Sequence, residues 1–98
     1  MAVQNFSDKA TEYFFITGQC RKGVGWKNLK KIAKRKLDIL HYAHELHDLR
    51  SPPGNHLEAL QGCWKGWHSI RMNDQWRIVF QWTLKGPESV QILDYHKG

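Results

Sequence analysis

Residues 67–96 read WHSIRMNDQWRIVFQWTLKGPESVQILDYH, and this stretch decides the fold. Three runs rich in β-branched and aromatic residues, at 67–72, 76–84 and 89–96, are separated by short clusters of Asn, Asp, Gly and Pro. Such runs with such breaks predict an antiparallel meander of three strands. In the middle strand, alternation directs one set of side chains to each face of the sheet. One set is Trp76, Ile78, Phe80 and Trp82, and the other is Arg77, Val79 and Gln81.

The residues before the meander predict helices. Ser7 is the predicted N-cap of a short helix over residues 8–17, which Gly18 ends. Residues 26–48 form the strongest periodic segment, with apolar side chains over an arc of roughly 180° on a helical wheel. The pattern predicts an α+β fold in one domain, 1–98, whose long helix covers one face of a mostly antiparallel sheet. The other predicted segments are short strands at 2–6 and 56–60 and a loop at 51–55.

Four lysines share the polar side of the predicted 26–48 helix. They are Lys27, Lys30, Lys31 and Lys34. No carboxylate is interleaved on that face, whereas a surface that serves only solubility mixes charges of both signs. Together with the formal net charge of +6, this lysine stripe favours binding to a phosphate backbone over a merely solvated helix face.

Lys36 is the exception on this helix, because it projects near the middle of the apolar arc. Two interpretations of it are open. Its stem packs on the core while the ammonium reaches solvent at an edge, or the ammonium enters a cleft where the helix meets the sheet. We include Lys36 among the candidate RNA-binding residues.

Composition excludes several classes of protein. A hydrophobic content of 41% is typical of a packed domain, and no apolar run approaches the ~20 residues of a membrane span. Without a signal peptide the chain is expected to be cytoplasmic, with Cys20 and Cys63 reduced. The spacing of His41, His44 and His47 does not match a metal-binding helix motif, so no metal is expected. A triad of Ser69, His68 and Asp94 lacks the glycine motifs that such triads need.

The end of the third predicted strand carries the most specific chemical signal, Asp94-Tyr95-His96. Cleavage of RNA by its own 2′-OH needs a proton acceptor, a proton donor and cations around the phosphorane. Histidine transfers protons near neutral pH, aspartate can orient it, and arginine binds phosphate through paired hydrogen bonds. Tyr95 can stack on a base or bind the phosphate. Arg71 and Arg77, on the neighbouring strands, complete a candidate site that needs no metal or other cofactor. The alternative is a structural pair of Asp94 with Arg77, and a frayed His96.

Six motifs, in order along the chain from residue 36, match one family. They are Lys36-Leu37-Asp38, Leu-Arg-Ser-Pro-Pro-Gly-Asn at 49–55, Leu-Glu-Ala-Leu at 57–60, Ser69-Ile70-Arg71, Asn-Asp-Gln-Trp-Arg-Ile at 73–78 and Asp94-Tyr95-His96. The chain resembles the HigB-type killer toxins of bacterial type II toxin–antitoxin modules, in the RelE/ParE superfamily.

The resemblance implies a RelE-like fold, in which two N-terminal helices pack on one face of a small twisted sheet. It also implies ribosome-dependent, metal-independent cleavage of mRNA in the A site, and a HigA-type helix-turn-helix antitoxin as partner. By position, His96, Tyr95 and Asp94 match the family's catalytic group, and Arg77 matches its phosphate-binding arginine. Arg71 is shared with closer relatives.

The chain departs from some relatives at two positions. Gln61 replaces a catalytic lysine, and Glu58 lies near the place of a histidine. The general base is therefore left open between Lys36 and Asp94. Two other functions stay open as well: a non-catalytic gyrase inhibitor similar to ParE, and a simple basic RNA-binding module.

Overall fold

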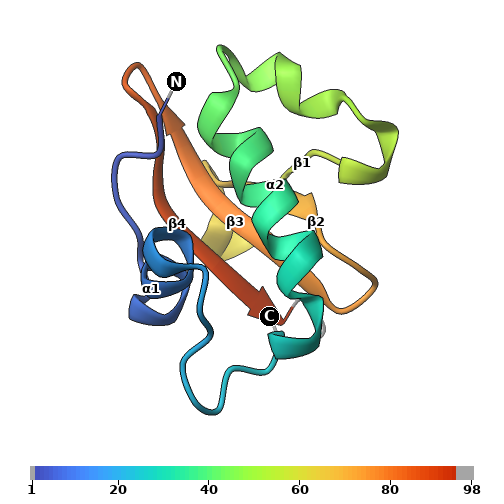
Figure 1. Ribbon diagram of the computed structural model, residues 1–98. Helices are drawn as coiled ribbons and strands as arrows, with labels where there is room; N and C mark the ends of the chain where they lie inside the picture. Colours follow the sequence, from blue (N-terminus) through green and yellow to red (C-terminus); the bar gives the residue numbers. More distant parts are fainter. Residues whose placement is uncertain (1, 95–98) are drawn as a thin grey trace.

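The protein is described here by a computed structural model, whose described residues are 2–94 (Figure 1). Two α-helices precede a four-stranded antiparallel sheet with strand order β1-β2-β3-β4. This confirms the predicted α+β class and the antiparallel meander. Packing of both helices on one face stays a prediction. The elements are α1 (Lys9–Thr17), η1 (Lys27–Leu29), α2 (Lys30–Tyr42), η2 (Leu46–Arg50), η3 (Pro53–Asn55), β1 (Glu58–Ala59), η4 (Gly62–Trp64), β2 (His68–Arg71), β3 (Trp76–Thr83) and β4 (Gly86–Asp94).

The hydrophobic core confirms the predicted alternation in β3. Ile78 and Phe80 are completely buried and belong to the same core cluster as Phe14 of α1 and Leu37 of α2. Trp76 and Trp82 pack at the edge of the same core. Each fully buried large apolar side chain contributes about 1.5–3 kcal/mol relative to exposure. The core thus fixes which face of β3 carries Arg77.

The last strand begins earlier than predicted. Gly86 and Pro87, expected in a turn, belong to β4 because they pair with Thr83 and Trp82 of β3. The register shifts once between Val79 and Gln81, where the ladder is irregular. The connection between the two strands consists of Leu84 and Lys85, and Gly86 after it has a φ of 122°, which only glycine adopts readily.

The first helix begins one residue later than predicted. Asp8, not Ser7, is its N-cap, and the Asp8 carboxylate accepts hydrogen bonds from the Thr11 backbone N–H (2.6 Å) and hydroxyl (2.9 Å). The Ser7 N–H instead donates to the Val90 carbonyl (2.9 Å). Gly18 ends the helix as predicted, in the left-handed conformation that favours glycine.

The segment before α1 lies along the outer edge of β4 without forming the predicted strand. Phe6 makes a single parallel bridge with Val90. The Gln4 N–H donates to the Pro87 carbonyl (2.8 Å), and the Val90 N–H donates to the Asn5 carbonyl (3.1 Å). These bonds occupy backbone groups that an edge strand would otherwise expose.

The long helix is shorter than predicted, because α2 ends at Tyr42 and Ala43 is extended. The Asp48 carboxylate accepts hydrogen bonds from the backbone N–H groups of His44 (3.0 Å) and Glu45 (3.1 Å), which starts η2 as a separate turn. The predicted 26–48 helix is therefore a 3₁₀ turn, an α-helix and a second 3₁₀ turn. His44 and His47 do not lie on α2 with His41.

Candidate active site

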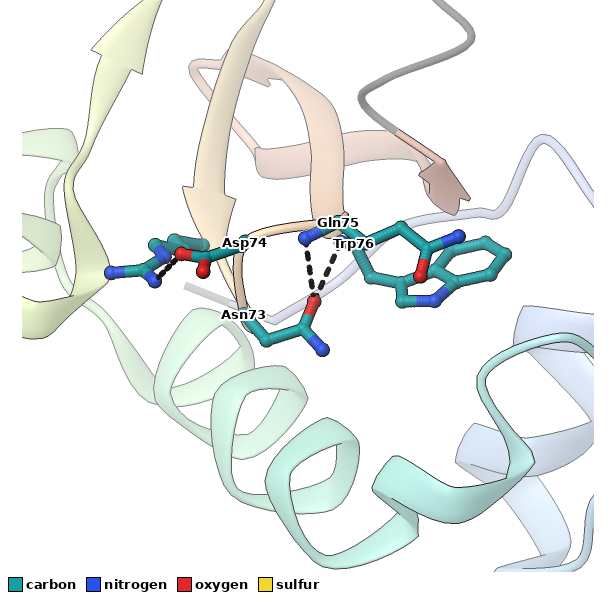
Figure 2. Close-up of polar contacts among 5 residues, drawn as sticks. Asn73, Asp74, Gln75 and Trp76 are labelled. Carbon is teal, nitrogen blue, oxygen red and sulfur yellow. Dashed lines mark hydrogen bonds and ion pairs between the residues drawn. The ribbon is translucent and has the colours of Figure 1, made fainter.

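The turn between β2 and β3 sets the register of the candidate site. The Asn73 side-chain oxygen accepts hydrogen bonds from the backbone N–H groups of Gln75 (2.9 Å) and Trp76 (2.8 Å), as Figure 2 shows. This bridging oxygen closes the turn, and β3 then runs back along β2 with Arg71 directly opposite Arg77. Asparagine suits this position because its short side chain can bond the backbone two residues on.

The two arginines differ in environment although they are neighbours across the strands. Arg71 is about one-third exposed and forms an ion pair with Asp74 of the turn. Arg77 is only 7% exposed. Its Nε donates to the Ser69 hydroxyl (2.7 Å) and its Nη2 to the His56 carbonyl (2.5 Å). The Arg77 guanidinium is therefore held in one orientation.

Glu58 supplies a carboxylate to the same neighbourhood. Its Oε1 lies 3.8 Å from the Arg77 Nη2. Glu58 pairs with Ser69 across β1 and β2, so it stands on the same side of the sheet as Arg77. The Arg77 charge is thus partly balanced by a half-exposed carboxylate.

A pocket of about 420 Å³ lies on the face of the sheet that the core does not use, and two of its lining residues are neighbours of Arg77 in the sheet. Leu93, one of its lining residues, is directly opposite Arg77 on β4, and Val79, another, lies two positions along β3. The volume falls within the range of about 300–1,000 Å³ that is usual for small-molecule sites. The remaining lining residues are Glu58, Ala59, Leu60, Gln61 and Trp64.

Asp94 occupies a different place from the two arginines. It pairs with Trp76, and its Oδ2 accepts a hydrogen bond from the Gln75 side-chain amide (2.9 Å). Alternation along β4 directs Asp94 to the face opposite that of Leu93, and hence opposite that of Arg77. Tyr95 and His96 lie outside the described residues, so their convergence with the arginines stays a prediction.

Lys36 is almost completely buried, with an exposed fraction of 5%. Its ammonium does not reach solvent at an edge of the helix but donates a hydrogen bond to the Asn55 side-chain oxygen in η3. Burial lowers the pKa of Lys36, and the nearby charges of Arg35 and Arg71 lower it further. Its buried partner Asn55 and the Arg77 partner Ser69 were not among the predicted site residues.

The two missed residues left different traces in the sequence. Ser69 sits in a strand whose alternation places it on the Arg77 side, so a small polar residue there was a usable signal. Asn55 stands in a Pro-Pro-Gly-Asn loop, where its type suggests only a turn.

The lysine stripe is exposed, as predicted. Lys34 forms an ion pair with Asp38 one turn later on α2 (3.0 Å). The expectation that no carboxylate lies among these lysines was wrong, because Asp38 lies beside Lys34, the last lysine of the stripe. The exposed members are Lys27 of η1 and Lys30, Lys31 and Lys34 of α2.

Residues 2–94 contain no cluster of three side chains able to hold a metal ion. Among the helices of the described part, none is long and apolar enough to cross a lipid bilayer. The two arginines carry their own positive charge, so they can bind an anion without a metal ion.

Comparison with known proteins decides the family. Residues 4–96 match the sequence model of the family described as RelE-like toxin of type II toxin–antitoxin system HigB. The chain is a HigB-like toxin. It is 41% identical to Toxin HigB-1 of Vibrio cholerae serotype O1 over 97 aligned residues, and this alignment covers 99% of each chain. It is also 35% identical to an uncharacterized protein of Haemophilus influenzae over 79 aligned residues. This alignment covers 81% of the present chain and 77% of the Haemophilus protein.

Family membership adds a partner to the structural description. A HigB-like toxin of a type II module acts together with an antitoxin, so this chain has a protein partner. The four-stranded antiparallel sheet preceded by two helices agrees with the RelE-like description of the family.

Proposed function

We propose that this HigB-like toxin is an endoribonuclease that cleaves mRNA in the A site of translating ribosomes in the cytoplasm. The observation that carries the proposal is the cross-strand pair of Arg71 and Arg77, whose neighbours in the sheet, Val79 and Leu93, line the 420 Å³ pocket. Two arginines at directly opposite positions on adjacent strands bring two positive charges to one face of the sheet. A phosphodiester is the ligand that such a pair fits best.

The proposed reaction uses the substrate's own nucleophile. The 2′-oxygen of RNA gives its proton to a general base of the site and attacks the adjacent phosphorus, the bond from phosphorus to the 5′-oxygen breaks, and a 2′,3′-cyclic phosphate remains. His96 gives the leaving 5′-oxygen its proton, and Tyr95 contacts a base or the phosphate. This scheme needs no metal, because the arginines supply the positive charge that the phosphorane requires.

The rigid mounting of Arg77 supports a role in the transition state. Hydrogen bonds to Ser69 and His56 fix its guanidinium before any substrate arrives. Preorganised charge stabilises a developing anion without a reorganisation cost at the moment of reaction. Arg71 is more exposed, and an arriving phosphate can exchange with its Asp74 partner.

We propose that the lysine stripe contacts ribosomal RNA and that the antitoxin is a HigA-type helix-turn-helix protein. Lys27, Lys30 and Lys31 are exposed on one side of α2 and η1. Lysine acts as a point charge toward a phosphate backbone and carries no sequence preference. The ribosome then positions the mRNA for the arginine pair.

Brief expression of the toxin, followed by mapping of mRNA ends on ribosomes, tests this function. We expect new ends in codon phase, their suppression by the co-expressed antitoxin, and their loss in a folded His96→Ala variant. Intact mRNA accompanied by DNA damage would favour a gyrase inhibitor similar to ParE. RNA that is bound but uncut would favour a plain RNA-binding module.

A further inference from the structure

A continuous set of buried polar contacts connects α2 to Arg77. The Lys36 ammonium donates to the Asn55 side-chain oxygen. The Asn55 side-chain nitrogen donates to the backbone carbonyls of Leu49 (3.1 Å) and Ser51 (3.2 Å). Asn55 is completely buried. The Asn55 side-chain amide therefore bonds two earlier residues of the 49–55 loop, and the Lys36 ammonium links this amide to α2.

The next residue, His56, connects this loop to Arg77 through its backbone carbonyl. His56 has a φ of 43°, in the left-handed region that non-glycine residues seldom occupy. Its carbonyl oxygen accepts the hydrogen bond from Arg77 Nη2 at 2.5 Å. His56 takes this conformation as the C-cap of η3, where its N–H donates to the Pro53 carbonyl (3.1 Å), and Asn55, immediately before it, is fixed by three side-chain hydrogen bonds.

We propose that Lys36 and Asn55 are positioning residues, which hold the 49–56 loop so that the His56 carbonyl orients the Arg77 guanidinium. The effect on cleavage rests on the proposed function, whereas the effect on Arg77 does not. Because Lys36 is buried and its ammonium bonds Asn55, we infer that it affects RNA cleavage through Arg77 and not by direct contact with RNA.

A packing role alone does not account for a lysine at this position. The surrounding members of α2, Ala33, Leu37 and Leu40, are apolar and buried, and an apolar residue at position 36 would fit the same surface. Burying a cation close to Arg35 and Arg71 costs stability. A lysine at this position therefore indicates that its hydrogen bond has a role that apolar packing does not fill. Holding Asn55 against the loop is such a function.

The first experiment observes Arg77 directly. The Nε–H proton of Arg77, which bonds Ser69, is followed by NMR for its chemical shift and its hydrogen exchange in the full-length toxin. Lys36→Met keeps the apolar stem and removes the ammonium. We expect a changed Arg77 Nε–H shift and at least tenfold faster exchange, while amides of β3 such as Phe80 keep their protection. Lys85→Met, an exposed lysine in the turn between β3 and β4, is the control and should change neither.

A milder variant guards against simple loss of folding. Asn55→Asp keeps an oxygen for Lys36 but loses the two donors to Leu49 and Ser51. One oxygen of the new carboxylate pairs with the ammonium, whereas the other faces the Leu49 and Ser51 carbonyls, which repel it and loosen the loop. Circular dichroism checks that the variant is folded, and its Arg77 Nε–H should exchange faster than in the wild type. An unchanged Arg77 Nε–H in folded Asn55→Asp and Lys36→Met proteins would overturn the inference.

The second experiment asks whether the relay matters through Arg77. Single-turnover cleavage on programmed ribosomes is compared in Asn55→Asp, Arg77→Lys and the double variant. We expect Asn55→Asp to lower the cleavage rate tenfold or more with unchanged ribosome affinity, and to add no further loss in the Arg77→Lys background. Losses that multiply would show that Asn55 acts independently of Arg77.

The two proposals fail in different ways. If the wild-type toxin cuts no RNA, the proposed nuclease function fails, and the NMR comparison still decides whether Lys36 and Asn55 hold Arg77. If the wild-type toxin cuts RNA and the variants leave Arg77 unchanged, the positioning role fails alone.

Discussion

Arg71 and Arg77 stand directly opposite each other on neighbouring antiparallel strands. Like charges in this arrangement destabilise a sheet. Two carboxylates offset the repulsion, since Asp74 pairs with Arg71 and Glu58 lies 3.8 Å from Arg77. A sheet selected for stability alone has no need of this arrangement, whereas a surface that must hold a phosphate does.

Replacement of Arg77 by lysine should damage catalysis more than binding. Lysine cannot reproduce the simultaneous hydrogen bonds to Ser69 and the His56 carbonyl, so the charge is no longer fixed. We expect single-turnover cleavage to fall by about 10²–10³-fold, the usual effect of losing one transition-state donor. The exposed Arg50→Lys is the matched control. A normal cleavage rate in Arg77→Lys would remove Arg77 from the catalytic machinery.

Neutralising the lysine stripe should flatten the salt dependence of ribosome binding. Lys27, Lys30 and Lys31 are changed together to glutamine, and the slope of log affinity against log salt should fall by up to about 0.7–0.9 for each phosphate that the lysines no longer neutralise. Lys34 should contribute less, because Asp38 already pairs with it. The control is an equal loss of charge elsewhere, at the exposed Lys9, Lys65 and Lys85. Equal slopes for the two triple variants would mean that the stripe is simply solvated.

Asn73 should matter for stability more than its partial exposure suggests. Its side chain accepts hydrogen bonds from two backbone N–H groups of the β2–β3 turn. Asn73→Ala leaves both without this partner, and we expect a loss of about 1–2 kcal/mol in the free energy of unfolding. Urea titration measures it, with Asn28→Ala, an exposed asparagine of η1, as the control. Equal stability of the two variants would contradict the role of Asn73.

His68 should make the protein less stable under mildly acidic conditions. Its Nδ1 is buried with no hydrogen-bond partner within residues 2–94, and burial lowers the pKa of His68 below 6.5. The unfolded chain then binds a proton at a pH where the folded protein does not, so stability falls as the pH drops below about 6.5. His47, Arg50 and Glu58 line the pocket beside it.

The His68→Gln variant isolates this effect. Unfolding free energies are measured by urea titration between pH 5 and pH 7.5 for both proteins. We expect the wild-type curve to fall toward acid more steeply than the curve of the variant. Parallel curves would mean that His68 carries the same charge in the folded and unfolded states.

The meander could be predicted from sequence because its signals are local. β-branched and aromatic runs, alternation and turn residues all lie within 67–96, and alternation correctly separated Ile78 and Phe80 from Arg77. The end of α2 could not be predicted in the same way. Ala43 and Leu49 continue the apolar pattern and are buried, but the Asp48 side chain captures the His44 and Glu45 N–H groups and starts a new turn.

The candidate site was only partly predictable for a related reason. Sequence reasoning chose Arg71 and Arg77 from their strands, and the register places them together. It marked Lys36 as anomalous but did not identify Asn55 as its partner, 19 residues away, because nothing in a loop sequence specifies which distant side chain it contacts. Asp94 was grouped with the arginines, whereas its pairing with Trp76 turns it to the other face.

The N-terminal segment on the edge of β4 also decides how this toxin is best handled. Gln4 is bonded beside Pro87, and Asp94 lies seven residues further along β4, a span of roughly 23 Å. A fluorophore attached at Ala2 therefore lies near the β3–β4 turn, because the Gln4 side chain bonds the carbonyls of both Ala2 and Lys85. Surface immobilisation through Ala2 leaves the opposite end of the sheet accessible to an object as large as a ribosome.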